Sequence, residues 1–513
     1  MSFDTTTFLF LFLPGVIIAY MLAAWGERWT QKKASTTGRT TVARNAVLLV
    51  ASLLFYAWGE PICVLLLIAS SMVAWGAGIL MHRWQGQLAA RIVMAVTVVL
   101  LLTSLGAFKY LGFLLFNLNR IPGIDLPLVD LRLPIGISFF TFQILSYVFD
   151  LYRGNIGVQR NPLRLLLYIS LFPQLIAGPI VRYSTVETEL TQRTSTSADI
   201  YEGSLRFIRG LAKKIIIADN VARFSEVVYS IHFNSQEDAL VYPSVGTTAL
   251  WVAALAYTLQ LYFDFSGYSD MAIGLGRIFG FHFLENFNFP YISRSITEFW
   301  RRWHISLSGW FRDYVYIPLG GNRRGLHRQL LNIMIVWMLT GLWHGAAWNF
   351  ILWGLFYGCL LLIEKIWRSS PIRRKVHETL RLPYLDDAET ADNKVLYGVS
   401  SLVHWGVTFV IVNMGWVLFH ICVLSNLLDV LKSMFQWRDT DWLRLMATNA
   451  DACLALPYIG LGLVCAFPLF RFISNCQNVV VQTVRPMLAT AAFLLCLVYI
   501  YSSTFHPFIY FRF

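Results

Sequence analysis

The chain has few charged residues for its length. Only 14% of its 513 residues are Asp, Glu, Lys or Arg, whereas 57% are hydrophobic. A soluble protein of ordinary composition has about 25% charged residues. A larger core cannot account for so large a deficit, so much of the surface must face hydrocarbon. The composition therefore excludes an ordinary soluble enzyme and predicts a membrane protein.

Several chemical signatures are also missing from the sequence. The seven cysteines are scattered, mostly through apolar runs, and include no CxxC pair, which argues against a zinc site or a disulfide framework. No GxSxG nucleophile motif occurs, and the glycine spacing follows no P-loop or dinucleotide pattern. Strand-type alternation is absent, which argues against an outer-membrane barrel. We therefore expect no metal site.

Apolar stretches of spanning length recur along the chain. A transmembrane helix needs roughly 20 apolar residues, and about a dozen segments approach that length. They are Phe8–Ala24, Ala46–Trp58, Ile62–Met81, Ile92–Ala107, Leu133–Tyr152, Leu163–Val181, Thr247–Phe263, Leu330–Trp343, Trp348–Ile366, Val403–Val423, Tyr458–Phe472 and Met487–Tyr501. The sequence predicts an all-α polytopic membrane protein, with some shorter segments as re-entrant helices. The first segment lacks a basic n-region, so we interpret it as a retained anchor.

Basic residues outnumber acidic ones, which gives a formal net charge of +12. They gather in alternate loops, as the positive-inside rule describes for cytoplasmic loops, so we expect no nucleic-acid partner. This alternation places the N-terminus outside and Arg301–Arg328 and Arg368–Arg381 on the cytoplasmic side. No long polar domain interrupts the chain. We therefore expect one membrane domain over residues 1–513, ending in C-terminal helices and a tail over 421–513.

The region 255–358 differs from its flanks because Trp, Gly, Asp, Arg and His occur there together. Polar residues at membrane depth usually line cavities, so we predict the catalytic core here. Asp264 and Asp270 should face protein or water, because a carboxylate at the bilayer centre costs about 2.5–3.5 kcal/mol. We interpret both as members of structural ion pairs, with possible partners Arg277, Arg301 or Arg302.

Two histidines in this region stand in similar surroundings. His304 lies in "EFWRRWHISLSGWF" and His344 in "GLWHGAAWNF", each directly after a tryptophan. Imidazole is the side chain best suited to move protons near neutral pH. Small residues around His344 leave space for a substrate. For His304 the alternative is a passive position on an arginine-rich interfacial helix.

These two segments closely resemble the membrane-bound O-acyltransferase (MBOAT) family, as do "AYTLQLYFDFSGYSDMAIGLG", "LPIGISFFTFQILSYVFDLYRG" and "LFPQLIAGPIVRY". The likeness covers roughly Phe8 to His420 and is to the bacterial branch that O-acetylates exopolysaccharides such as alginate. It implies a bundle of about 11–13 transmembrane helices, with interfacial helices, around a central funnel in the bacterial inner membrane. It also implies His344 as the catalytic base. His304 would be the second signature residue, positioning a thioester or polarising its carbonyl.

The resemblance further implies acetyl-CoA as the acyl donor, with no bound cofactor. Its phosphates would suit arginines at the funnel mouth, where the candidates are Arg301, Arg302, Arg312, Arg323 and Arg324. Pairing with Asp313 or Glu298 is the structural alternative for these arginines. The C-terminal "FIYFRF" makes Tyr510 either an acyl relay or an aromatic interface anchor. The expected partners are periplasmic SGNH-hydrolase-like acetyltransferase subunits, the exopolysaccharide machinery and membrane lipid.

Three alternatives stay open at the level of sequence. The same chemistry could serve cellulose or another envelope polymer. A transporter of an acyl donor would use Asp264, Asp270 and Lys109 as coupling residues, but it predicts two related halves that we do not find. A scaffold for a polymer synthase complex would need no reactive histidine.

Overall fold

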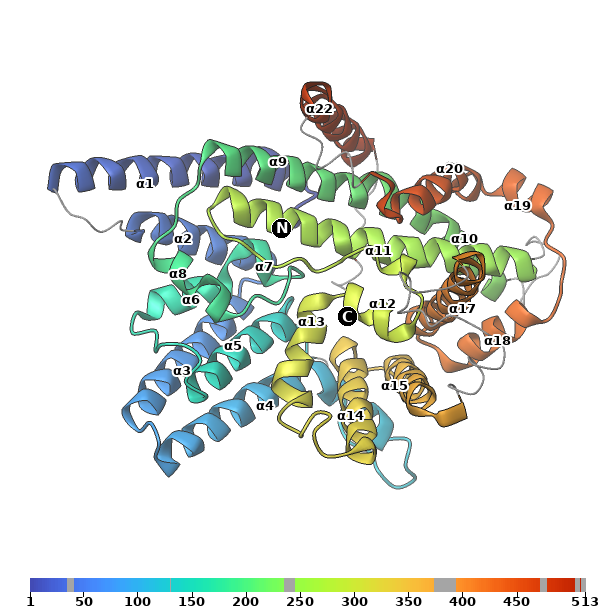
Figure 1. Ribbon diagram of the computed structural model, residues 1–513, viewed down its shortest axis with the longest axis horizontal. Helices are drawn as coiled ribbons and strands as arrows, with labels where there is room; N and C mark the ends of the chain where they lie inside the picture. Colours follow the sequence, from blue (N-terminus) through green and yellow to red (C-terminus); the bar gives the residue numbers. More distant parts are fainter. Residues whose placement is uncertain are drawn as a thin grey trace. The chain divides into compact units, whose positions relative to one another are not determined.

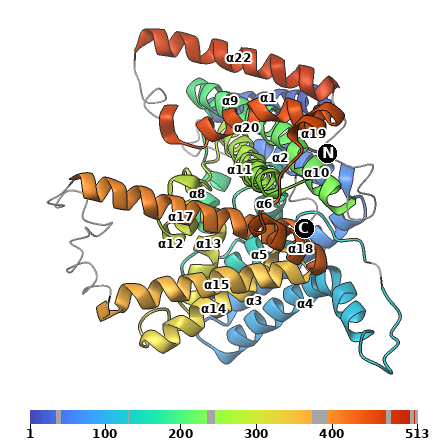
Figure 2. The same ribbon diagram turned by 90° about the vertical axis from the view of Figure 1, so that its right-hand side faces the viewer.

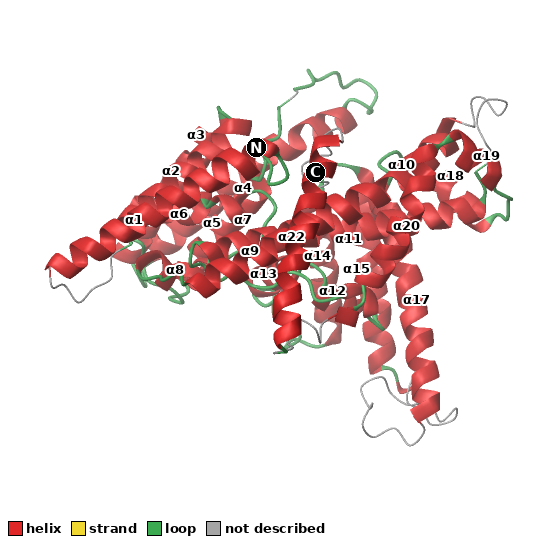
Figure 3. Ribbon diagram, turned by 90° about the horizontal axis from the view of Figure 1, so that it is seen from above, coloured by secondary structure: helices red, strands yellow, loops and turns green. Residues whose placement is uncertain are grey.

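The computed structural model describes residues 1–34, 41–129, 131–234, 245–372, 394–470, 478–502 and 508. Every regular element in these ranges is a helix (Figure 3), which confirms the predicted all-α class. The chain divides into two compact units, each assembled from separate stretches. Unit 1 comprises Met1–Ile215, Phe265–Glu285 and Thr483–Phe513, and unit 2 comprises Ile216–Asp264 and Asn286–Gln482. The region 255–358 therefore contributes to both.

Unit 1 contains the N-terminal helices, drawn from blue to green in Figure 1. In chain order they are η1 (Phe8–Phe12), α1 (Leu13–Ala34), α2 (Val42–Gly59), α3 (Cys63–Arg83), α4 (Leu88–Leu118), α5 (Ile137–Tyr152), α6 (Pro162–Ser170), α7 (Phe172–Leu175), α8 (Tyr183–Thr191) and α9 (Ser197–Ala212). Helices α3, α4 and α5 pack on one another, and α2 packs on α6. Most of α22 (Val479–Ser502) also belongs to this unit.

Two of the predicted spans in unit 1 are not single spanning helices. The segment Leu133–Tyr152 contains only the 16-residue helix α5, in which nearly every side chain is buried. The segment Leu163–Val181 is divided between the short helices α6 and α7, whose side chains are also mostly buried. Both segments are apolar because they pack inside protein, and composition alone cannot distinguish that environment from lipid.

Seven described helices are long and apolar enough to cross a membrane, fewer than the dozen predicted segments. They cover Phe8–Thr30, Val42–Gly59, Cys63–Arg83, Leu88–Leu118, Trp348–Ser369, Tyr397–His420 and Val479–Ser502. The pair α19 (Trp442–Thr448) and α20 (Ala450–Cys465), bent by 106°, would make an eighth. These helices make the chain a multi-pass membrane protein.

Unit 2 carries the remaining helices. They are α10 (Asp219–Asn234), α12 (Ile296–Arg302), α13 (Ile305–Phe311), α14 (Leu326–His344), α15 (Trp348–Ser369), α17 (Lys394–His420), α18 (Leu424–Phe435), α19 and α20. Short helical segments η3 (Pro290–Ile292), η4 (Arg312–Tyr316) and η5 (Pro468–Phe470) connect some of them. The long helix α11 (Thr247–Ile278) belongs to unit 2 up to Asp264 and to unit 1 from Phe265, and η2 (Lys213–Ala218) likewise spans the division.

Helices α14 and α15 lie side by side in both Figure 1 and Figure 2. Glycine permits this close packing: a Cβ atom added at Gly354 would lie 2.6 Å from the carbonyl oxygen of Trp337. A Cβ atom at Gly341 would collide with the carbonyl oxygen of Phe350. No other residue type fits at such a crossing. The crossing therefore holds the C-terminal end of α14, where His344 lies, at a fixed place on α15.

Asp270 in unit 1 is held by three cations. Its carboxylate accepts hydrogen bonds from Arg206, Arg209 and Lys213, with shortest distances of 3.0, 3.0 and 2.8 Å. The partners expected from the sequence are not the ones observed, because Arg277 pairs with Asp199 and Arg302 with Glu298. A buried carboxylate is stabilised by such pairing. The arrangement supports the structural interpretation of Asp270.

Candidate active site

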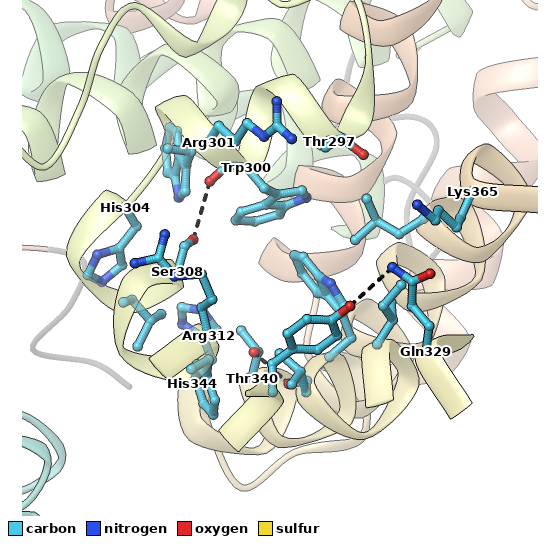
Figure 4. A pocket seen from close by; sticks show the side chains of 18 of the residues that line it. Thr297, Trp300, Arg301, His304, Ser308, Arg312, Gln329, Thr340, His344 and Lys365 are labelled. Atoms are coloured by element: carbon cyan, nitrogen blue, oxygen red, sulfur yellow. Dashed lines mark hydrogen bonds between the residues drawn. The ribbon is translucent and has the colours of Figure 1, made fainter. Parts of the chain in front are cut away.

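The candidate site is a cavity of about 410 Å³ in unit 2, shown in Figure 4. Its wall is formed by α12, α13, the following η4, α14 and α15. Both His304 and His344 line it. Residues of the wall are otherwise largely aromatic or aliphatic, among them Trp300, Trp303, Leu307, Phe311, Ile333, Val336, Trp337 and Leu361. The two histidines predicted from sequence are therefore brought together in one mostly apolar cavity.

His304 occupies a sharp turn between α12 and α13. Its φ of 45° and ψ of 55° are left-handed, a conformation that residues other than glycine seldom adopt. Main-chain and side-chain atoms of Asn286 hold the turn: the Asn286 carbonyl oxygen accepts from Ile305 N at 3.0 Å, and Asn286 Oδ1 accepts from Ser306 N at 3.1 Å. A strained backbone that is held in this way is common at functional sites.

The His304 side chain is also fixed and is almost fully buried. Its Nδ1 atom lies 3.1 Å from Asn286 Oδ1. Burial lowers the pKa of His304 to about 3, because the charged ring would lose its hydration. The residue lies outside the seven spanning helices. His304 is therefore a neutral imidazole at physiological pH.

His344 is the last residue of α14 and has only 5% of its surface exposed. Three aromatic rings enclose its imidazole: the centroids of Trp343, Trp353 and Phe419 lie 4.9, 5.0 and 5.1 Å away, each nearly perpendicular to it. As the last residue of α14, His344 lies at the negative end of the dipole of that helix. The ring is thus held in one orientation at the cavity wall.

Cations also line the cavity. Among the described residues, Arg301 and Lys365 make no ion pair or hydrogen bond, whereas Arg312 pairs with Asp313 and Arg368 with Glu364. Figure 4 shows Arg301 on the α12 side of the cavity and Lys365 on α15. A cation with no protein partner is available to an anionic ligand.

The five arginines predicted to bind the donor do not form one group. Arg301 and Arg312 line the cavity. Arg302 instead bonds to Glu298, the structural alternative, and Arg323 and Arg324 are exposed residues outside the cavity wall. Tyr510, the predicted acyl relay, lies outside the described residues.

Sequence reasoning did not single out Lys365, Arg368 or Asn286 as site residues. Lys365 and Arg368 stand one turn apart near the end of α15, where cations are usually explained as membrane-surface anchors. Their place in the wall depends on the packing of α15 against α14. Asn286 precedes His304 by many residues, and nothing in the segment "ENFNFP" distinguishes it from its polar neighbours Glu285 and Asn288.

Comparison with known proteins identifies the family of the chain. Residues 6–372 match the family described as "MBOAT, membrane-bound O-acyltransferase family". The chain is 38% identical over 471 residues to a probable alginate O-acetylase of Pseudomonas aeruginosa, which covers 90% of this chain and 81% of that protein. It is also 38% identical over 475 residues to the corresponding Pseudomonas putida protein, covering 90% of this chain and 87% of the relative.

The match to a relative that is named for a different polymer is nearly as long. The peptidoglycan O-acetyltransferase of Helicobacter pylori is 33% identical over 459 residues, covering 84% of this chain and 79% of that protein. The family match includes both His304 and His344. The resemblance seen in the sequence motifs is confirmed. The chain therefore belongs to the membrane-bound O-acyltransferase family and is a multi-pass acyltransferase.

Proposed function

We propose that this enzyme takes acetyl groups from cytoplasmic acetyl-CoA and relays them across the bacterial inner membrane for O-acetylation of an exopolysaccharide, with alginate as the proposed polymer. The observation that carries the proposal is the shared cavity of His304 and His344, with Arg301 and Lys365 in its wall. The relatives named as alginate O-acetylases support the choice of polymer. The alternative acceptor is another envelope polymer, because one relative is named for peptidoglycan.

His344 acts as the general base in this proposal. Its imidazole takes the proton of the accepting hydroxyl as that oxygen attacks the thioester carbonyl. The C–S bond then breaks, and the thiolate leaves with the proton that the imidazolium returns. General-base help of this kind contributes about 10²–10⁴-fold. The apolar wall around the ring strengthens electrostatic interactions during the step, because little water competes with them.

The free cations give the donor its orientation. The phosphates of acetyl-CoA would bind Arg301 and Lys365, while the pantetheine arm extends along the apolar wall toward His344. Charge-assisted hydrogen bonds to phosphate are roughly twice as strong as neutral ones. This orientation of the donor requires the side of the cavity that carries Arg301 and Lys365 to face the cytoplasm. The positive-inside alternation of basic loops predicts the same orientation.

The acetyl group would next reach the periplasmic side. Tyr510 is our candidate for an intermediate acyl carrier, and an SGNH-hydrolase-like acetyltransferase is the candidate partner that passes the acetyl group to the polymer. The argument is topological: CoA thioesters are cytoplasmic and the polymer is exported, so some protein must carry the acyl group across.

The test replaces His344 with Ala and scores polymer acetylation in cells, with membrane expression and monodispersity checked for each variant. The matched control is His327→Ala, an exposed histidine on the same helix that does not line the cavity. We expect acetylation to be lost in the first variant and kept in the second. Full acetylation by His344→Ala would end the proposal.

A separate variant, Tyr510→Phe, tests the relay step alone. If the phenol oxygen is the acceptor, Tyr510→Phe should lose thioester cleavage and polymer acetylation together, with membrane expression unchanged. Normal acetylation would remove Tyr510 from the pathway and leave the role of His344 in place.

A further inference from the structure

The hydrogen bonds around Asn286 determine which nitrogen of His304 carries the proton. Asn286 Oδ1 accepts from the main-chain N–H of Ser306 at 3.1 Å and from Ser306 Oγ at 2.9 Å. A main-chain nitrogen can only donate. The atom that faces it must therefore be the amide oxygen, and the alternative orientation of the Asn286 amide is excluded.

His304 Nδ1 faces this same oxygen at 3.1 Å, and the Ser306 hydroxyl, which donates to Asn286 Oδ1, lies farther away at 3.5 Å. An unprotonated Nδ1 would place two lone pairs against each other at hydrogen-bond distance. A protonated Nδ1 makes a hydrogen bond instead, and Asn286 is itself only 1% exposed, so the bond is shielded from water. The neutral ring therefore carries its proton on Nδ1 and a lone pair on Nε2.

We propose that Asn286 is a positioning residue that locks His304 in the Nδ1–H tautomer, so that Nε2 accepts a hydrogen bond from a protic group of the substrate. This inference rests on the proposed function for its place in catalysis. A ring in this state cannot donate from Nε2 to a thioester carbonyl. The role of polarising that carbonyl, which the sequence motif suggested for His304, is thereby replaced by that of a hydrogen-bond acceptor.

The same contacts explain why the left-handed turn at His304 persists. A left-handed backbone is unfavourable for any residue other than glycine, because its Cβ atom crowds the following carbonyl oxygen. Asn286 offsets this cost with two acceptor atoms, its carbonyl oxygen toward Ile305 and its side-chain oxygen toward Ser306. One residue thus fixes the backbone, the tautomer and the ring orientation together.

The first experiment reads the tautomer directly and needs no activity. Purified full-length protein labelled with ¹⁵N-histidine is examined by solid-state NMR, and the His304 signals are identified by their loss in His304→Asn, since Asn tolerates a left-handed backbone. We expect a protonated Nδ1 and an unprotonated Nε2. A protonated Nε2 would overturn the proposal.

The second experiment compares two variants of Asn286 with one variant of the nearby Asn288. Asn286→Leu removes the acceptor, and we expect it to lose the single tautomer and about 10–100-fold in acetyl transfer. Asn286→Asp keeps an acceptor oxygen and should restore both the Nδ1–H form and most of the activity. Asn288→Leu is the matched control, because Asn288 is exposed and lies two positions along the same segment.

Two outcomes separate this inference from the proposed function. A wild-type tautomer in Asn286→Leu would overturn the positioning role even if His344→Ala is inactive. An active His344→Ala variant would end the proposed mechanism, whereas the tautomer measurement on His304 would still stand by itself.

Discussion

The indole of Trp343 packs against the imidazole of His304, with ring centroids 6.0 Å apart and planes at 67°. Trp343 also contacts His344, its neighbour in the chain, at 4.9 Å. One aromatic side chain therefore touches both histidines and sets the separation between them. Because α14 carries Trp343, the position of this helix determines the geometry of the pair.

Replacing Trp343 by Phe should reduce acetyl transfer without unfolding the protein. The smaller ring keeps an aromatic contact but leaves both imidazoles less constrained, and a displacement of about 1 Å at a reacting group can cost roughly 10²-fold. We expect a loss between about 3- and 30-fold in the single-turnover rate. Trp348→Phe, an exposed tryptophan at the start of α15, serves as the control. A wild-type rate in Trp343→Phe would contradict this role.

The free cations predict a charge-dependent donor affinity. Arg301→Gln and Lys365→Gln should each raise KM for the proposed donor, acetyl-CoA, by about 3- to 10-fold with a smaller change in kcat, because half-exposed charge pairs contribute roughly 1 kcal/mol. The wild-type KM should rise with ionic strength, since salt screens such contacts. Initial rates in detergent measure both effects.

Arg323→Gln provides the matched control for this prediction. Arg323 was an equal candidate from the sequence, but it is exposed and does not line the cavity. We expect its KM to match the wild type. An increase in KM for Arg323→Gln as large as that for Arg301→Gln would show that net charge matters and the cavity does not.

The crossing of α14 and α15 predicts a stability effect. Gly341→Ala places a methyl group against the Phe350 carbonyl and the backbone of Gly354, and overpacking of this kind costs about 1–3 kcal/mol. Gly406→Ala is the control, because a Cβ atom there meets nothing within 4 Å. Thermal unfolding in detergent should show a lower Tm for Gly341→Ala and an unchanged or higher Tm for Gly406→Ala. Equal Tm values would argue against a close crossing.

The cluster around Asp270 predicts a second stability effect, in unit 1. Asp270→Asn leaves Arg206, Arg209 and Lys213 facing one another without their shared carboxylate, and removal of one partner from a buried pair costs about 3–5 kcal/mol. Glu285→Gln, which removes an exposed partner of Arg206, should cost about 1 kcal/mol or less. A smaller loss of Tm for Asp270→Asn than for Glu285→Gln would contradict the assignment.

Much of the fold follows from the sequence because spanning helices need long apolar runs. The α15 segment, for example, was predicted as Trp348–Ile366 and is observed as Trp348–Ser369. The prediction failed at α5 and α6, where burial inside protein produces the same composition as exposure to lipid. Local periodicity carries no information about which apolar partner a helix will meet.

The two histidines stand out in the sequence for a different reason, and the family resemblance implies their roles. Each imidazole lies in a local context of tryptophan and small residues that is unusual in a lipid-facing helix. Lys365 and Asn286 have no such context, because they reach the site only through the packing of α15 on α14 and through the turn that brings Asn286 to His304. Their positions at the site arise from tertiary contacts.

The glycine crossing has a practical consequence for altering donor range. His344 is placed by backbone contacts between α14 and α15 at Gly341 and Gly354, and these contacts do not involve the cavity-lining side chains Ile333, Val336 and Leu361. Smaller side chains at those three positions should therefore enlarge the cavity without moving the His344 imidazole. Under the proposed function, redesign toward propionyl or longer acyl groups should begin at these positions.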